Sequence, residues 1–330
     1  MQNDQNVSFK NIPWALTQEE HSIIGLVFYC FILFFGIVIN VTALWVFFLS
    51  TKKKTSVTIY MINLAIVDLA FICLLPLRLV YYIQKRWPFG DLLCRISTAI
   101  TVFYPAMALW LFALISADRF VVLTQSRYSN ELKNVSKAVL SSVGVWVMVL
   151  GISLPLLFIK EDPDQASNFT TCSKMFDVAH LHVDNAVSFV RLIFYFLVPI
   201  CIIIGCNTII LNNLTCGRAA KLKSKMKKQS VRIIITLLLQ IVICFVPYHV
   251  CFVIQLVRPQ KDEYRTWSSS MGCLMNLSTI LDILLFYIVS KEVKERVRSV
   301  VRYRNYRRSR RRNNHPALVP LASMNNALLV

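Results

Sequence analysis

Residues Ile23 to Leu49 read IIGLVFYCFILFFGIVINVTALWVFFL, without a single charged side chain. A continuous helix of this length, rising about 1.5 Å per residue, can cross the roughly 30 Å hydrocarbon core of a bilayer. Lipid offers no water to backbone N–H and C=O groups, so a spanning segment has to satisfy them within its own helix. We therefore predict that this segment is a transmembrane helix.

Six more apolar segments of similar length follow along the chain. They are Val57–Tyr82, Leu92–Val122, Ala138–Ile159, Ala186–Leu211, Val231–Val257 and Trp267–Val289. Hydrophobic residues make up 56% of the 330 residues, charged residues make up 16%, and the mean hydropathy is +0.56. That composition is too apolar for the surface of a soluble protein. The predicted fold class is an all-α membrane protein, a seven-transmembrane helix bundle.

The basic residues predict which side of the membrane each end occupies. Most of the 36 Lys and Arg fall in alternate connections and the tail, at Lys52–Lys54, Arg119 to Lys137, Arg218 to Arg232 and Lys291 to Arg312. By the positive-inside rule these segments are cytosolic and the N-terminus is extracellular. The net charge of +19 is then explained by topology and by contact with anionic lipids, so we expect no nucleic-acid partner.

This topology divides the chain into four parts. Residues 1–22 are predicted to form an extracellular N-terminus without a cleaved signal peptide, and residues 23–289 form the transmembrane domain. Residues 290–303 carry valines at helical spacing opposite Lys and Arg, which predicts a short amphipathic helix on the inner leaflet. Residues 304–330 are predicted to be a disordered, basic cytosolic tail.

Two of the ten cysteines are predicted to face the outside. Cys94 opens the third helix and Cys172 lies in the longest external loop, whereas the others fall in apolar segments or on the cytosolic side. We therefore expect a Cys94–Cys172 disulfide. Asn6 and Asn168 begin external sequons and are candidate glycosylation sites. No cluster of His, Cys, Asp or Glu has the spacing of a metal site.

A series of polar and proline positions runs through the apolar segments. In order they are Asn40, the segment Asn63 to Asp68, Cys94, Asp118-Arg119-Phe120, Trp146, Pro199, the segment Cys244 to Pro247 and the segment Asp282 to Phe286. Together this series resembles the rhodopsin-like (class A) G-protein-coupled receptors from the first helix to the start of the tail. The segments Trp87–Gly90, Leu109–Trp110 and Tyr303–Tyr306 are similar to a lipid-responsive branch of that family.

Asp68 is predicted to lie in mid-membrane, where a carboxylate needs partners. Asn40, Asn63 and Asp282 are the polar groups that can surround it. Two adjacent carboxylates do not both ionise easily, so either a proton or a cation is expected between them. The resemblance implies a sodium ion as the only candidate cofactor, although Ala108 stands where the family usually offers a hydroxyl.

The resemblance also implies a heterotrimeric G protein of the inhibitory type as partner and a switch at the cytosolic end. Asp118 and Arg119 form either a simple capping ion pair or an inactive-state latch that releases Arg119. Pro199 and Pro247 interrupt helix hydrogen bonds and can act as hinges. Five positions depart from the family pattern, and Phe120, Phe245 and Ile283 are substitutions that related receptors tolerate. Asn207 and Phe286 replace tyrosines of the switch, which predicts low basal activity and weak coupling.

The expected ligand is an anionic lipid, a fatty-acid amide or an oxidised polyunsaturated acid. Arg78 and Arg191 lie unpaired in apolar sequence near the outer ends of their helices, and an acidic ligand group would supply the missing partner. The alternative is that each snorkels to the outer interface or meets a nearby loop carboxylate. Thr101 occupies the position where amine receptors carry an aspartate. Other predicted pocket residues are Tyr81, Tyr82, Phe103, Tyr104, Tyr195, Tyr248, His249 and Met275.

Four other classes of protein are alternatives to a plasma-membrane receptor. A transporter or channel would be expected to show repeats or glycine-rich broken helices. A retinal pump needs a lysine in the seventh helix, and none occurs from Trp267 to Val289. An enzyme would need an acid and base or a nucleophile in a wet site, and the mid-membrane groups lack that pattern. A receptor-shaped decoy or partner subunit that does not signal stays an alternative.

Overall fold

The structure is a computed structural model that describes residues 18–51, 54–84, 86–124, 135–158, 172, 185–215, 224–257, 271–290 and 294. Several predictions fall outside these residues: the sequons at Asn6 and Asn168, nearly all of the amphipathic helix at 290–303 and the tail at 304–330.

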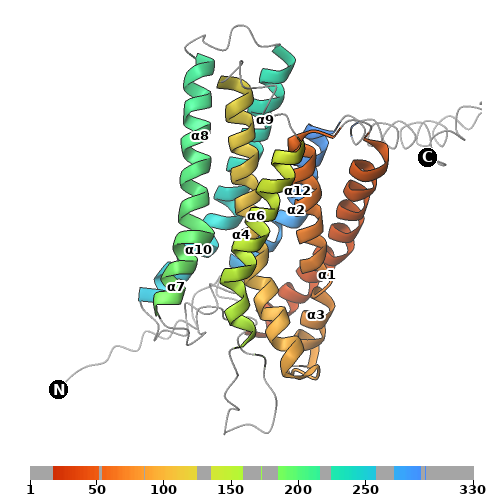
Figure 1. Ribbon diagram of the computed structural model, residues 1–330. Helices are drawn as coiled ribbons and strands as arrows, with labels where there is room; N and C mark the ends of the chain where they lie inside the picture. Colours follow the sequence, from red (N-terminus) through yellow and green to blue (C-terminus); the bar gives the residue numbers. More distant parts are fainter. Residues whose placement is uncertain are drawn as a thin grey trace, which may run out of the picture.

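Seven helices in the described part of the chain are long and apolar enough to cross a membrane (Figure 1). They span Gly25–Leu49, Ser56–Tyr81, Gly90–Thr124, Val135–Ser153, Ser188–Leu214, Lys227–Ile254 and Met271–Val289. Each overlaps one predicted segment, and no β-strand occurs among the described residues. The predicted fold class, a seven-helix bundle, is confirmed.

Most of these spans are built from more than one element. The long elements are α1 (Gln18–Trp45), α2 (Ser56–Ile72), α4 (Gly90–Thr124), α6 (Val135–Ser153), α8 (Val198–Thr215), α9 (Ser224–Gln240) and α12 (Ser278–Val289). The shorter ones are α3 (Leu75–Gln84), α7 (Asn185–Leu192) and α10 (Val246–Val257). Helix α4 packs against α2, α6 and α8, while α12 packs against α1 and α9. The third span is therefore the central one, and it is the most completely buried.

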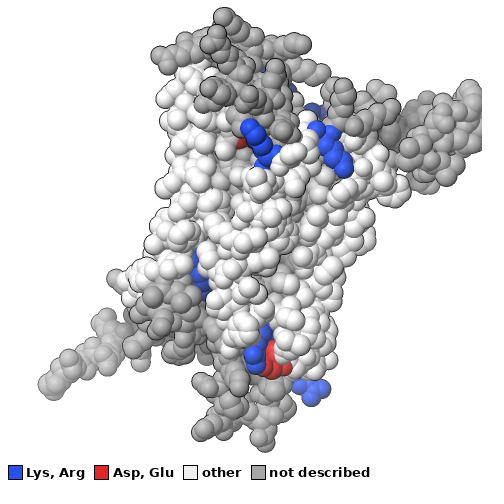
Figure 2. Space-filling view, in the orientation of Figure 1, with Lys and Arg blue, Asp and Glu red and all other residues white. Residues whose placement is uncertain are grey.

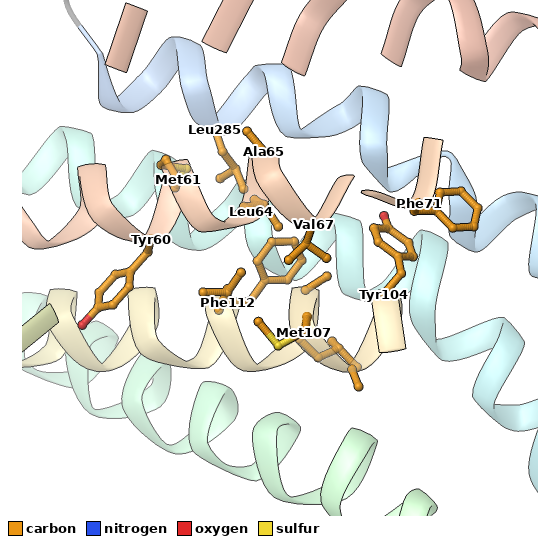
Figure 3. Close-up of a cluster of buried hydrophobic side chains, with 14 of the residues drawn as sticks. Tyr60, Met61, Leu64, Ala65, Val67, Phe71, Tyr104, Met107, Phe112 and Leu285 are labelled. Atoms are coloured by element: carbon orange, nitrogen blue, oxygen red, sulfur yellow. The ribbon is translucent and has the colours of Figure 1, made fainter. Parts of the chain in front are cut away.

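The core lies between α2 and α4. Phe71 of α2 stacks on Tyr104 of α4 with ring centroids 4.8 Å apart, and Leu64, Met107 and Phe112 are fully buried beside them (Figure 3). Asp68 lies on the same buried side of α2 as Leu64 and Phe71. The aromatic and aliphatic packing therefore encloses the mid-membrane carboxylate on which the sequence analysis depended.

The outer surface of the bundle is apolar. Large side chains such as Leu49 and Leu140 are more than 70% exposed. In Figure 2, charged side chains lie toward the two ends of the bundle, and the wide surface between them carries none. A surface of this kind is stable against lipid and not against water, in agreement with membrane insertion.

The second span was predicted as one continuous helix, and the structure corrects this. Helix α2 ends at Ile72 and α3 begins at Leu75, with a turn at residues 73–74 between them. Pro76 explains the break, because its ring has no N–H to donate to Ile72, four residues earlier, and clashes with the carbonyl of that residue. The break re-aims the last part of the span, which carries Arg78.

Two further prolines are preceded by wider, π-helical turns. Turn η6 spans Ile193–Leu197 just before Pro199, and η7 spans Ile241–Phe245 just before Pro247. In a regular α-helix, the side chains of Arg191 and Ile203 would point in directions about 120° apart around the helix axis. The π turn η6 takes up one extra residue, which reduces this angle to about 20°. Both side chains are in fact buried, at 5% and 0% exposure. The π turn therefore rotates Arg191 into the bundle.

The two ends of the bundle carry different groups. At one end Cys94 and Cys172 form the predicted disulfide, with their Cα atoms 5.8 Å apart. Trp87 packs against this disulfide and donates from Nε1 to the carbonyl of Gly90 at 2.8 Å. At the other end of α4 lie Asp118 and Arg119. These are called the disulfide end and the Arg119 end below.

Candidate functional site

A small, half-open cavity of about 30 Å³ lies between the third, fifth and sixth spans. Its lining residues come from α4, from α7 with η6, and from α10: Val102, Pro105, Ala106, Arg191, Leu192, Tyr195, Tyr248, His249 and Phe252. Four of the predicted ligand residues meet here, namely Arg191, Tyr195, Tyr248 and His249. The cavity has room for a small polar group and not for a lipid chain.

Arg191 is the charged group of this cavity. Its residue is 5% exposed, and its Nε and Nη1 atoms have no hydrogen-bond partner among the described residues. The guanidinium lies 5.9 Å from the centre of the Phe252 ring, a weak cation–π contact. Guanidinium stays charged in proteins, and a buried charge without hydrogen bonds is costly. The cavity is therefore arranged for a group that can accept from Arg191.

The other polar groups of the cavity are held by the protein itself. The Tyr195 hydroxyl lies 2.8 Å from Ser153 Oγ and 3.3 Å from the carbonyl oxygen of Val149, both in the fourth span. His249 Nδ1 lies 2.8 Å from the carbonyl oxygen of Phe245, and its ring stacks on Phe196 at 4.1 Å. These contacts fix the walls and leave Arg191 as the group with spare donors.

Arg78 differs from what the sequence suggested. It was expected to lack a partner, but it donates from Nη2 to Thr101 Oγ1 and from Nη1 to the Tyr29 hydroxyl at 3.3 Å. The same guanidinium lies 5.6 Å from the centre of the Phe71 ring. The prediction that Arg78 is unpaired was wrong, because Pro76 breaks the helix and Tyr29 of α1 was not considered.

The remaining predicted ligand residues lie away from the cavity lining. Tyr104 is fully buried and bonds to Ser278, and Met275 is 1% exposed in the core. Tyr81 packs beside Trp87 at the disulfide end. The side chain of Tyr82 lies outside the described residues. Thr101 is a neighbour of Val102 on α4, but its hydroxyl accepts from Arg78 and donates to the carbonyl of Ser97 at 2.7 Å.

A second polar site surrounds Asp68. The carboxyl groups of Asp68 and Asp282 are neighbours, and both residues are fully buried. Both oxygens of Asp68, Oδ2 of Asp282 and Oδ1 of Asn40 have no hydrogen-bond partner among the described residues. Asn40 uses its Nδ2 instead, donating to the carbonyls of Gly36 at 3.0 Å and Thr279 at 3.1 Å. An acceptor-rich site of this kind fits a cation or a proton.

Asn63 does not belong to that site, contrary to expectation. Its Nδ2 donates to the carbonyl of Ile59 at 2.8 Å, and its Oδ1 accepts from Trp146 Nε1 at 2.9 Å. Asn63 therefore joins α2 to α6. A residue that was missed, Gln240 of α9, donates from Nε2 to Asp282 Oδ1 at 2.8 Å. A glutamine inside an apolar helix was the signal that could have identified it.

At the Arg119 end, Arg119 donates to the carboxylate of Asp118, from Nη2 and from Nε at 3.1 Å. Beside this pair, Leu123, Ile210 and Ile234 form a buried apolar cluster that joins α4, α8 and α9. The three helices are therefore packed together at this end. The ion pair suits either a capping role or a latch, as the sequence analysis left it.

The remaining predicted switch residues are buried between helices. Phe245 packs edge-on against Phe112 at 5.9 Å, and Phe286 packs edge-on against Phe47 at 5.7 Å. Asn207 is 3% exposed, and both atoms of its amide have no hydrogen-bond partner among the described residues. Phe120 is half-buried at the edge of the apolar cluster, and Pro247 follows η7.

The chain was compared with known proteins. Residues 39–291 match the family described as "7 transmembrane receptor (rhodopsin family)". The N-arachidonyl glycine receptor of Rattus norvegicus is 51% identical over 94% of this chain and 95% of its own length. That of Homo sapiens is 49% identical over the same shares. Lysophosphatidic acid receptor 6 of Homo sapiens is 30% identical over 80% of this chain and 79% of its own length.

These relatives confirm both the predicted family and the expected likeness to a lipid-responsive branch, and all of them are receptors rather than enzymes. The family match covers the end of the first span and the six spans that follow it, together with the Arg191 cavity, the Asp68 site and the Asp118–Arg119 pair. The chain belongs to the rhodopsin family of seven-transmembrane receptors.

Proposed function

We propose that this protein is a plasma-membrane receptor that recognises an anionic lipid through Arg191 and signals to a heterotrimeric G protein of the inhibitory type. The observation that supports the ligand class is the buried guanidinium of Arg191, which has two spare donors beside a cavity. A carboxylate accepts in-plane hydrogen bonds from guanidinium, so an acidic lipid head group matches it in charge and shape. The chemistry favours a fatty-acid amide that ends in a carboxylate, or an oxidised polyunsaturated acid.

The size of the cavity supports a division of the ligand into two parts. About 30 Å³ admits a head group, and the apolar chain would then lie against the apolar surface beside it, where Val102, Leu192 and Phe252 form part of the lining. The relatives are receptors named for a lipid amino acid and a lysophospholipid, which are both anionic lipids. This agreement in chemical class supports the proposal.

The proposed orientation places the disulfide end outside the cell and the Arg119 end in the cytosol. The positive-inside rule supports it, because the basic segments predicted to be cytosolic adjoin the Arg119 end. A G protein would then meet Arg119 once it leaves Asp118 and the apolar cluster of Leu123, Ile210 and Ile234 opens. The Asp68 site would hold a sodium ion or a shared proton, with Asn40 and Asp282 as its partners.

The ligand proposal is tested by changing the charge on both partners. The Arg191→Gln receptor should bind N-arachidonyl glycine about ten- to hundredfold more weakly, because hydrogen bonds between charged groups contribute about 1.5–3 kcal/mol. The uncharged methyl ester of the same lipid should bind the parent and the variant equally. Binding to purified receptor is the measurement.

Arg95→Gln is the matched control, because this variant also loses one positive charge near the disulfide end. Unlike Arg191, Arg95 is already paired with a carboxylate, that of Asp91. Its affinity for the acid should stay that of the parent. If Arg191→Gln retains the parent affinity for the acid, the proposed charge anchor is wrong. If no acidic lipid drives nucleotide exchange on any G protein, the non-signalling decoy becomes the better interpretation.

Weak coupling is the second expectation, and it rests on Asn207 and Phe286. The family's usual tyrosines at these positions carry hydroxyls that meet through water in the active state. Phe286 has no hydroxyl, and it packs on Phe47 instead. We expect the double replacement Asn207→Tyr with Phe286→Tyr to raise basal and agonist-driven nucleotide exchange about fivefold, which corresponds to one hydrogen bond of roughly 1 kcal/mol. Strong coupling by the parent, unchanged in the double variant, would contradict this.

A further inference from the structure

Helix α9 carries two glutamines, one near its start and one at its end. Gln229 and Gln240 are eleven residues apart, both within the regular helix and before η7 begins at Ile241. At 3.6 residues per turn this spacing brings them within about 20° of each other around the helix axis. Both side chains therefore lie on one face of α9, and the contacts below show that this face is turned toward α12.

The contact at Gln240 is in the middle of the bundle. The side chain is 2% exposed, and its Nε2 donates to Asp282 Oδ1 at 2.8 Å. The other oxygen of Asp282, Oδ2, has no hydrogen-bond partner among the described residues. Gln240 is therefore the group that stabilises this carboxyl from the sixth span. A buried acceptor that loses such a donor is strongly disfavoured.

The contact at Gln229 is at the Arg119 end, where α12 stops. The last carbonyls of a helix have no partner within it. The N–H of Ser290 donates to the carbonyl of Phe286, and Gln229 Nε2 reaches the carbonyls of Ile288 at 3.2 Å and Val289 at 3.4 Å. Lys294 Nζ also donates to Ile288, at 2.9 Å. Gln229 thus caps the end of α12 from a neighbouring helix.

Among the described side chains of α9, which begin at Lys227, no other donates a hydrogen bond to another described helix. Thr236 bonds within α9, to the carbonyl of Arg232. The sequence from Ser224 to Val257 contains no Asp or Glu, so the sixth span has no carboxylate to offer Arg119. Toward α4 and α8 the contact is apolar, through Ile234. The polar attachment of α9 is therefore to α12, at both glutamines.

We propose that Gln229 and Gln240 form a two-point latch that holds α9 against α12 and keeps the Arg119 end closed. Opening this end requires α9 to move away from its neighbours, and such a movement breaks both contacts at once. The mid-membrane contact also joins the latch to the Asp68 site through Asp282, so a proton or cation at that site acts directly on the carboxyl that Gln240 holds. The effect on signalling rests on the proposed receptor function, whereas the latch itself does not.

The test uses the full-length receptor without ligand and the variants Gln240→Met, Gln229→Met and the double replacement. Methionine keeps the length of the side chain and removes the amide. Thr236→Val is the matched control, because it removes a polar group of α9 that bonds only within its own helix. Hydrogen–deuterium exchange of the peptides from α9 and from the end of α12 reports the latch directly, and basal nucleotide exchange on an added G protein reports its consequence.

Each single replacement should speed deuterium uptake in α9. It should also raise basal nucleotide exchange by about three- to tenfold, as expected for the loss of one interhelical hydrogen bond in a membrane. The double replacement should exceed either single one, and Thr236→Val should match the parent. Gln229 lies near the rim, so its variant keeps the test valid if Gln240→Met folds poorly. Faster uptake without any G-protein response would support the latch and refute the signalling proposal. Parent-like uptake in the Gln229 variant would overturn the latch.

Discussion

Arg78 and Arg191 are buried to almost the same degree, at 4% and 5% exposure, but their surroundings differ. Arg78 bonds to Thr101 and Tyr29, and Tyr29 in turn accepts from Asn276 at 3.4 Å. Arg191 has a single aromatic neighbour at cation–π distance and two donors without partners among the described residues. The first arginine joins the first, second, third and seventh spans, and the second faces a cavity.

The comparison shows that a buried charge in an apolar helix can either stabilise the fold or bind a ligand. The degree of burial alone does not distinguish these two roles. A buried charge whose donors are all matched stabilises the arrangement that matches them, whereas one with spare donors destabilises the free protein and favours a partner that accepts from it. Arg78 therefore belongs to the scaffold in our account. Arg191 belongs to the proposed ligand site.

The largest expected effect comes from removing the π turn that turns Arg191 inward. Deletion of Phe194 from η6 should restore a regular α-helix and rotate Arg191 by about 100°, toward lipid. Affinity for N-arachidonyl glycine should then fall at least as far as in Arg191→Gln, by about ten- to hundredfold. Ligand binding to purified receptor is the measurement.

The deletion also removes the Phe194 carbonyl that accepts from Trp110 Nε1 at 2.8 Å, so Trp110→Phe is its control. This control should lose about 1 kcal/mol of stability and keep its ligand affinity. A deletion variant that is folded and still binds the acid with parent affinity would show that the turn does not place Arg191.

A smaller effect is expected at Arg78. Arg78→Met should lower the free energy of unfolding by about 1–3 kcal/mol, because Thr101 and Tyr29 lose a charged donor in the core. Affinity for the acidic lipid, measured on the fraction that stays folded, should change little. Thermal denaturation and binding on the same preparation separate the two results. A stable Arg78→Met receptor that no longer binds the acid would assign Arg78 to the ligand site and erase the difference between the two arginines.

Much of this arrangement could be predicted from sequence because the bilayer makes polar groups conspicuous. Asp68, Asp282 and Asn40 are predicted to share one site since each is costly in lipid. The structure makes Asp68 and Asp282 neighbours, and Asn40 is fully buried with an Oδ1 that has no partner among the described residues. The disulfide followed from the two cysteines predicted to face outward. The seven spans followed from length and composition alone.

What sequence could not supply is the rotation of each helix. On a plain helical wheel Arg191 does not share a face with Ile203, and only the π turn aligns them. The partners of Arg78 depend on the break before Pro76 and on a tyrosine of the first span, which is distant in sequence. The contact between Gln240 and Asp282 joins two helices that are distant in sequence, so no local pattern predicts it. These contacts are tertiary, and no local pattern encodes them.

The central claim is that Arg191, whose Nε and Nη1 lack hydrogen-bond partners among the described residues, is the group that pairs with an anionic ligand. The thermal stability of Arg191→Met without ligand tests this claim most directly. Methionine fills a similar volume without the charge, so the replacement removes the cost of burying a charge whose donors are not matched. We predict that Arg191→Met unfolds at a higher temperature than the parent and gains no stability from N-arachidonyl glycine, whereas the parent does. A variant that unfolds at a lower temperature than the parent, or that the acid still stabilises, would contradict the account.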